Sequence, residues 1–119
     1  MRTKDLVKLL GVNLKVKGFY YVVSAIDLSR ACPEESILIT KDVYPRVASK
    51  FQTTSTGVEH AIRTAVNTAW INNKEMLDKI AGYKLFYRPS NKEFIMMTAS
   101  YLNELDFLKK NSSTILNKR

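Results

Sequence analysis

Six polar side chains recur at helical spacing between residues 56 and 67 and would share one helix face: Thr56, Glu59, His60, Arg63, Thr64 and Asn67. Arg63 can donate two hydrogen bonds to guanine O6 and N7, while Glu59 can accept one from cytosine N4 or orient Arg63. The same residues suit an ion pair between Glu59 and Arg63 at i, i+4, or a capping box between Thr56 and Glu59. The chemistry of this face is therefore hydrogen bonding, either to bases or within the helix.

Residues for covalent or metal chemistry are scarce in the sequence. Cys32 is the single cysteine and His60 the single histidine, so an internal disulfide, a thiolate metal site and a Cys-His dyad of recognisable spacing are all excluded. Neither a catalytic carboxylate pair nor a phosphate-loop motif is recognisable. We therefore expect no enzyme, no cofactor and no metal, and His60 is left to contact a groove or to be solvated.

The apolar runs are short, as in residues 19–23 and 37–39, and fall far below the roughly 20 residues that cross a bilayer. Residues 1–5 lead into a charged segment and do not form a secretory signal. A single cysteine fits a reducing compartment. These features predict a cytoplasmic protein with no membrane partner.

The helix that carries the polar face is predicted over residues 55–72, because its apolar residues recur every three or four positions: Val58, Ala61, Ile62, Ala65, Val66, Ala69 and Trp70. Residues 52–55 are rich in cap-forming types, and a helix with Pro45 in its first turn precedes them after a turn at residues 40–44. Its Val47, Ala48 and Phe51 would face inward. Two consecutive helices joined this way are what a helix-turn-helix requires.

The rest of the chain is also predicted to form helices. We expect a short helix over residues 3–10 closed by Gly11, and a helix over 74–80 closed by Gly82 with Met76, Leu77 and Ile80 inside. Residues 16–32 mix strand formers with helical spacing, and the spacing favours a helix before a loop at residues 33–36. After an extended connection over 83–89, Ser90 and Glu93 form a capping-box signature for a final helix whose apolar face continues to Leu105.

These segments predict an all-α fold, a six-helix bundle that contains a helix-turn-helix with its recognition helix at about residues 55–72. We expect a single domain over residues 1–108. Residues 109–119 form a basic tail with four Lys or Arg and no acid, which we expect to fray.

The 119 residues hold 19 Lys and Arg against 11 Asp and Glu, a formal net charge of +8 that favours a polyanionic partner over an acidic substrate pocket. Basic residues that only solvate the surface are the alternative, and charge alone does not decide between the two. The excess is uneven: residues 1–30 carry six basic and two acidic residues, 31–72 four of each, 73–89 four and two, and 90–119 five and three. Basic residues on the supporting helix and around the last turn are candidate phosphate contacts: Lys41, Arg46, Lys50, Lys84, Arg88 and Lys92. Residues 53–56 more often cap a helix than bind, but capping leaves helix amides beside a phosphate. Charge thus supports affinity more than specificity.

The run from Ile37 to Trp70 closely resembles the DNA-binding effector domain of the sporulation initiation response regulator family, stage zero sporulation protein A. Matching residues include Thr40-Lys41, Tyr44-Pro45, Lys50-Phe51, Thr53-Thr54, Val58-Glu59, Ala61-Ile62-Arg63 and Ala69-Trp70. The similarity covers roughly residues 6 to 105. It implies a six-helix domain, a helix over residues 16–32, and promoter DNA bound by a homodimer of paired monomers on adjacent repeats.

The resemblance also implies the base contacts. The positions matching the family's base-reading residues are Gly57, Glu59, His60, Arg63 and Thr64, of which Glu59 and Arg63 keep the usual residue type. Gly57 and His60 stand where arginines are usual, and Thr64 where histidine is usual, so the family's target sequence does not carry over. The expected phosphate contacts are Thr40, Lys41, Lys50, Thr54, Ser55, Thr56, Arg88 and Lys92.

The family's proteins normally carry a receiver domain phosphorylated on aspartate, and 119 residues leave no room for one. The expected function is a sequence-specific transcriptional regulator that is constitutively competent, controlled by abundance, or dependent on another protein; the chain could also be a piece of a longer one. RNA polymerase and a full-length regulator are the further partners considered. The alternative function is a decayed paralogue that acts as a protein-interaction module and antagonises a full-length regulator.

Overall fold

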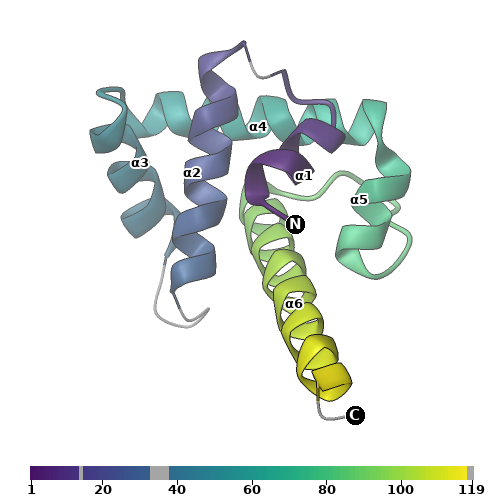
Figure 1. Cartoon of the computed structure of the whole chain (residues 1–119). Coiled ribbons are helices and arrows are strands. Elements are labelled where there is room, and N and C mark those ends of the chain that lie inside the picture. Colours follow the sequence, from purple (N-terminus) through teal and green to yellow (C-terminus); the bar gives the residue numbers. More distant parts are fainter. Residues whose placement is uncertain (14, 33–37, 118–119) are drawn as a thin grey trace.

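The computed structural model describes residues 1–13, 15–32 and 38–117, with side chains described as far as residue 111. Within these residues the chain is helical throughout and contains no strand (Figure 1). Six α-helices and one π-helical turn follow one another: α1 (Thr3–Leu9), α2 (Lys17–Ala31), η2 (Ile39–Val43), α3 (Tyr44–Lys50), α4 (Ser55–Asn72), α5 (Lys74–Ala81) and α6 (Asn91–Asn117). The predicted all-α class and six helices are confirmed. The loop predicted at residues 33–36 lies outside the described residues.

The α2 helix is the central support of the fold, because it packs against both α4 and α6. Its predicted helical state is confirmed, and Phe19, Val22 and Ile26 on its inward stripe are fully buried. Gly18 allows the close approach to α4, since a Cβ added there would lie 3.1 Å from the Cβ of Ala61. Small residues thus face each other where α2 and α4 cross, so the two helix backbones approach closely.

The short α3 and the long α4 are consecutive and pack against each other, with residues 51–54 between them. Pro45 lies in the first turn of α3, as its missing N–H requires, and the predicted preceding turn is η2. Thr54 caps α4 by accepting a hydrogen bond from the Gly57 N–H at 3.0 Å. The bounds of α4 agree with the predicted residues 55–72.

Both ends of α5 and the start of α6 follow the predicted signals. The Asn73 side chain caps α5, and Gly82, at φ 86°, ends it in the left-handed conformation that glycine tolerates. Ser90 and Glu93 form the reciprocal capping box at the start of α6: the Ser90 N–H donates to Glu93 Oε1 at 3.0 Å, and the Glu93 N–H donates to Ser90 Oγ at 3.1 Å.

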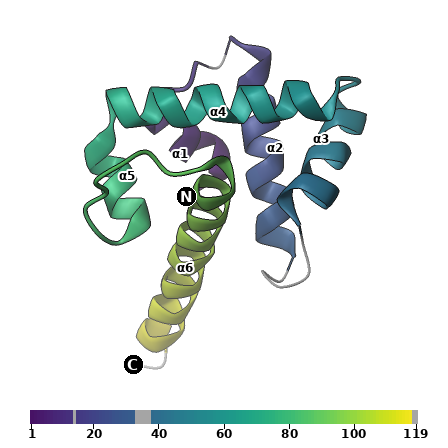
Figure 2. The same ribbon diagram turned by 180° about the vertical axis from the view of Figure 1, so that it is seen from behind.

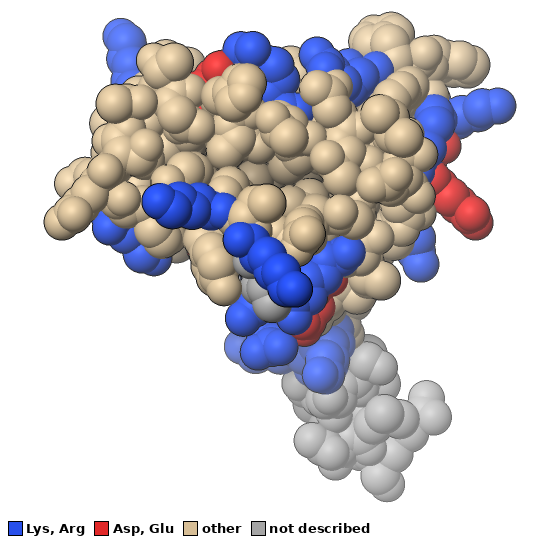
Figure 3. Space-filling model, turned by 90° about the horizontal axis from the view of Figure 1, so that it is seen from above, with Lys and Arg blue, Asp and Glu red and all other residues tan. Residues whose placement is uncertain are grey.

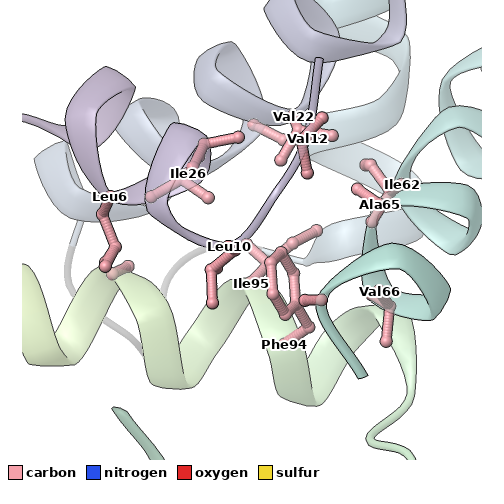
Figure 4. Packing of buried hydrophobic residues seen from close by; sticks show 14 of the residues in the cluster. Leu6, Leu10, Val12, Val22, Ile26, Ile62, Ala65, Val66, Phe94 and Ile95 are labelled. Atoms are coloured by element: carbon pink, nitrogen blue, oxygen red, sulfur yellow. The ribbon is translucent and has the colours of Figure 1, made fainter. Parts of the chain in front are cut away.

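The core lies where α1, α2, α4 and α6 meet. Figure 4 shows side chains of these four helices packed together, among them Leu6, Ile26, Ile62 and Phe94. Phe51, Trp70 and Met76, which the sequence predicted to face inward, are half-buried and pack against this core. Burial of one face of each helix is what holds the bundle together.

Arg30 at the end of α2 joins α1, α2 and α6 through its guanidinium. It donates to Asn103 Oδ1 at 3.0 Å and to Thr3 Oγ1 at 2.9 Å, and it forms an ion pair with Asp106. The side chain of Arg30 is largely buried, so these bonds satisfy a charge that would otherwise be costly to bury.

The α6 helix differs from the prediction at its far end. The sequence predicted an apolar face that continues to Leu105, a domain that ends at residue 108 and a frayed tail from residue 109, but α6 continues to Asn117 and projects from the body of the domain (Figure 1). The reason is that no proline or glycine stands between residues 91 and 117, and extending an existing helix avoids the cost of a new nucleus. The projection contributes to principal extents of 52 × 29 × 28 Å.

Candidate nucleic-acid interface

An open hollow of about 570 Å³ lies between the start of α4 and the start of α6. Three separate stretches of chain line it: Thr40 and Tyr44 from η2 and α3; Ser55, Thr56, Glu59 and Arg63 from α4; and Arg88, Ser90, Asn91 and Lys92 around the start of α6. In Figure 2, α4 crosses the molecule with the connection from α5 and the start of α6 beneath it. Predicted base contacts and predicted phosphate contacts therefore meet at one place.

The start of α4 supplies partial positive charge to this hollow. Thr54 satisfies the Gly57 N–H, whereas the amides of Ser55 and Thr56 belong to the first turn and have no carbonyl four residues back within the helix. Both residues line the hollow. The N-terminus of an 18-residue helix with amides directed outward favours an anion.

Arg63 and Glu59 form the i, i+4 ion pair that the sequence left open as an alternative to base contact. Arg63 remains 51% exposed while paired, so its remaining N–H groups face solvent at the hollow. Because the guanidinium has five donors, one carboxylate does not exhaust it. The pair therefore orients Arg63 and leaves it able to donate further.

Asn91, the first residue of α6, ties three helices together at the hollow. Its Nδ2 donates to the backbone carbonyl of Glu59 at 3.0 Å and to the Tyr44 hydroxyl at 3.3 Å. Burial raises the pKa of the Tyr44 phenol above its ordinary value, so the hydroxyl stays protonated at neutral pH. Within the described residues Tyr44 only accepts, and its own proton is left to donate into the hollow.

Arg88 and Lys92 supply the remaining charge. The guanidinium of Arg88 donates to Asn67 Oδ1, which fixes the connection between α5 and α6 against the middle of α4. Lys92 is exposed at the start of α6. With Arg63, three cations face one carboxylate, Glu59, around the hollow, so its local charge is positive. Hydrogen-bond donors and cations gathered at a helix N-terminus can bind a phosphate group.

Other predicted contacts lie away from the hollow. His60 and Thr64 are exposed on α4, and the Thr64 hydroxyl donates to the His60 carbonyl at 3.1 Å. Gly57 lies close against the threonine side chains at the start of α4, since an added Cβ would stand 2.9 Å from Thr53 Oγ1. Lys41 is exposed on η2 without lining the hollow, and Thr54 serves as the cap.

Lys50 and Arg46 are on another side of the helix pair. Together with Asp27 they line a separate hollow between α2 and α3, so they do not share the site with Arg63. Lysines and arginines are also spread over the rest of the surface: on the face in Figure 3 they lie around the margin, while the middle is largely uncharged. Positive charge is therefore distributed over several faces, and the hollow is distinguished by its donors.

Sequence reasoning missed Tyr44, Ser90 and Asn91 as members of the site. Tyr44 precedes Pro45 and Ser90 belongs to a capping box, but both patterns indicate only where a helix begins and not that the residue belongs to a site. No pattern identified Asn91, because its role depends on a carbonyl 32 residues earlier in the chain.

The fold places the chain among small all-helical domains, and none of the described helices is long and apolar enough to span a bilayer. The model of the family described as sporulation initiation factor Spo0A C terminal matches residues 3–102. The chain therefore belongs to this family, whose members are DNA-binding effector domains in sporulation and transcription regulation. The resemblance read from the residues is confirmed.

Proposed function

We propose that this chain binds double-stranded DNA in a sequence-specific manner and regulates transcription. In this proposal α3 and α4 form a helix-turn-helix, and α4 is the recognition helix that enters the major groove. One observation carries the proposal: residues expected from the sequence to contact bases or phosphates come from three stretches of chain and line one positively charged hollow.

The proposed binding mode assigns separate tasks to the residues around the hollow. The α4 amides, Tyr44, Arg88 and Lys92 hold a phosphate and thereby set the position of α4 along the duplex. Arg63 then donates to a guanine edge in the major groove, while Glu59 orients Arg63 or accepts from cytosine. His60 and Thr64, one helical turn apart on the exposed face, contact the neighbouring bases.

The proposal is tested by selecting bound sequences from a random duplex pool and then titrating the enriched duplex at several salt concentrations. We expect one enriched sequence, and a log affinity that falls linearly with log salt at about −0.9 per phosphate neutralised. A scrambled duplex of equal length is the control, and it should bind more weakly. Absence of any binding at low salt, or equal affinity for both duplexes, would contradict the proposal.

A further inference from the structure

Three large aromatic side chains project from the connection between α5 and α6. Tyr83 is 66% exposed, Phe86 84% and Tyr87 77%. Single exposed apolar residues are ordinary, but three aromatic rings within five residues form a patch that a partner can cover. We call residues 83–88 the aromatic segment. Neither the family match nor the polar hollow explains why these three aromatic rings are exposed.

The aromatic segment is anchored on both sides of its exposed pair. Leu85 is buried, and its N–H donates to Asp78 Oδ1 at 2.9 Å. The side chain of Arg88 donates to Asn67 on α4. Phe86 and Tyr87 therefore project from a backbone held at neighbouring residues, so that binding through them costs less ordering than binding through a free loop.

The charge around the aromatic segment indicates the class of partner. Residues 79–92 include four basic residues, Lys79, Lys84, Arg88 and Lys92, and no Asp or Glu. The carboxylate that contacts the segment, Asp78, is already paired with Lys74. A surface in which cations alternate with exposed aromatic rings suits a polyanion that also offers apolar sugar surfaces and groove edges. Nucleic acid has this combination, whereas an acidic protein surface offers charge alone.

The position of the aromatic segment places it beside the proposed recognition helix. The Arg88 contact to Asn67 holds the segment against the middle of α4, and Arg88 also lines the hollow. In Figure 2 the connection between α5 and α6 passes beneath α4. DNA with α4 in its major groove presents its backbone and an adjacent minor groove to elements that flank the helix.

We propose that the aromatic segment is a second DNA-binding element, which contacts the duplex flanking the sequence read by α4. Phe86 and Tyr87 pack on deoxyribose and base edges of the flanking minor groove, and Lys84 contacts a flanking phosphate. This inference rests on the proposed function, because it requires α4 to be bound to DNA.

The test compares wild-type protein with the double variant F86S/Y87S on two duplexes. One duplex carries the selected sequence with a helical turn, about 10 base pairs, of flank on each side, and the other is trimmed to the selected sequence. F107S is the matched control, because Phe107 is 60% exposed on α6 and lies outside the aromatic segment. Thermal unfolding and circular dichroism establish that each variant is folded.

We expect F86S/Y87S to bind the flanked duplex about tenfold to hundredfold more weakly than wild type, because the apolar burial of the two rings is lost, and to bind the trimmed duplex equally well. F107S should match wild type on both. Hydroxyl-radical footprints should lose protection on one flank in F86S/Y87S, and the conservative variant F86W/Y87F should restore it. Lys84→Gln should reduce the salt slope by about one phosphate equivalent.

Equal affinity of F86S/Y87S and wild type for the flanked duplex, with unchanged footprints, would overturn the inference. So would unchanged DNA binding together with loss of self-association in sedimentation, because the rings would then cover a protein surface. Failure of the wild type to bind either duplex is a different result, since it removes the proposed function and this inference with it.

Discussion

Arg63 has two uses for one guanidinium, and their magnitudes decide between them. An exposed i, i+4 ion pair such as the one with Glu59 contributes about 0.3–0.5 kcal/mol. A bidentate contact to guanine contributes about 1–3 kcal/mol of discrimination. Base contact is therefore worth more than the ion pair when DNA is present. In the free protein the ion pair restricts the Arg63 side chain to fewer orientations, so less conformational entropy is lost when Arg63 binds DNA.

Arg63→Ala should reduce affinity for the selected duplex about fivefold to hundredfold and remove the preference at one base pair. Arg46→Ala is the control, since Arg46 lines the separate hollow between α2 and α3. Its effect should be smaller and equal for all base substitutions. Competition binding with duplexes substituted one pair at a time measures both. A variant lacking Arg63 that keeps the full base preference would contradict the assigned role.

Tyr44→Phe should weaken DNA binding about tenfold with little change in stability, because a hydrogen bond to a charged group contributes about 1.5–3 kcal/mol. The hydroxyl accepts only a long bond of 3.3 Å from Asn91 in the free protein, so its removal costs the fold little. Fluorescence anisotropy titration measures the affinity. Tyr101→Phe, on α6, is the control, and an equal loss in both variants would argue against a phosphate contact by Tyr44.

At the scale of elements, most helix ends follow from local sequence and one does not. Gly11 and Gly82 adopt positive φ where the sequence predicts helix ends, because only local backbone geometry is involved. Gln52 also has a positive φ, 54°, just after α3, and its N–H and that of Thr53 bond back to the last carbonyls of α3. Glutamine carries no sequence signal for this conformation, which closes the end of α3 through these two local bonds.

Gln52→Gly should stabilise the domain by up to about 1 kcal/mol, because left-handed backbone costs a non-glycine residue about 1–2 kcal/mol and glycine loses about 0.5–1 kcal/mol of chain entropy. Gly82→Ala is the matched opposite, since nothing lies within 4 Å of its added Cβ and only backbone conformation changes. Gly82→Ala should destabilise the domain. Urea unfolding measures both, and a destabilised Gln52→Gly would show that the glutamine side chain makes a contribution of its own.

The capping box of α6 predicts a pH dependence. The Ser90 backbone N–H, followed by the Ser90 side chain, lowers the pKa of Glu93 below its ordinary value of 4.5. The ionised carboxylate therefore contributes stability at pH values above 4.5, and this contribution is lost as the pH falls through the lowered folded-state pKa.

Glu93→Gln should therefore be less stable than wild type near neutral pH, and the difference in free energy of unfolding should shrink as the pH falls below 4.5. Chemical unfolding at a series of pH values checks it. Glu104→Gln, at an exposed position of the same helix, is the control. A difference that stays constant across this pH range would mean that the carboxylate charge does not stabilise the cap.

At the scale of the whole molecule, the helices were predictable and the way they meet was not. Hydrophobic periodicity over 55–72 is a local property, so α4 could be predicted to the residue. The Asn91 bond to the Glu59 carbonyl and the Arg88 bond to Asn67 join residues that are far apart in sequence, and no single-sequence pattern encodes them. The hollow depends on both, so sequence predicted many of its residues without predicting its shape.

Phe94→Ala should destabilise the whole domain by about 3–5 kcal/mol, because its ring is fully buried at the junction of the core helices. That is a large part of the about 5–15 kcal/mol of a typical domain. Phe107→Ala, at an exposed ring on the same helix, should stay within about 0.5 kcal/mol of wild type. Equal losses in the two variants, measured by urea unfolding, would contradict the assigned core.

The bonds from Arg30 to Asn103 and Asp106 have a consequence for synthesis. The α2 helix is made early, but one of its two main packing partners, α6, is made last. At a translation rate of about 5–20 residues per second, α2 waits on the order of ten seconds before residue 106 has been added. Until then the nascent chain presents Phe19, Val22 and Ile26 without their complete cover, because α6 has yet to pack against α2.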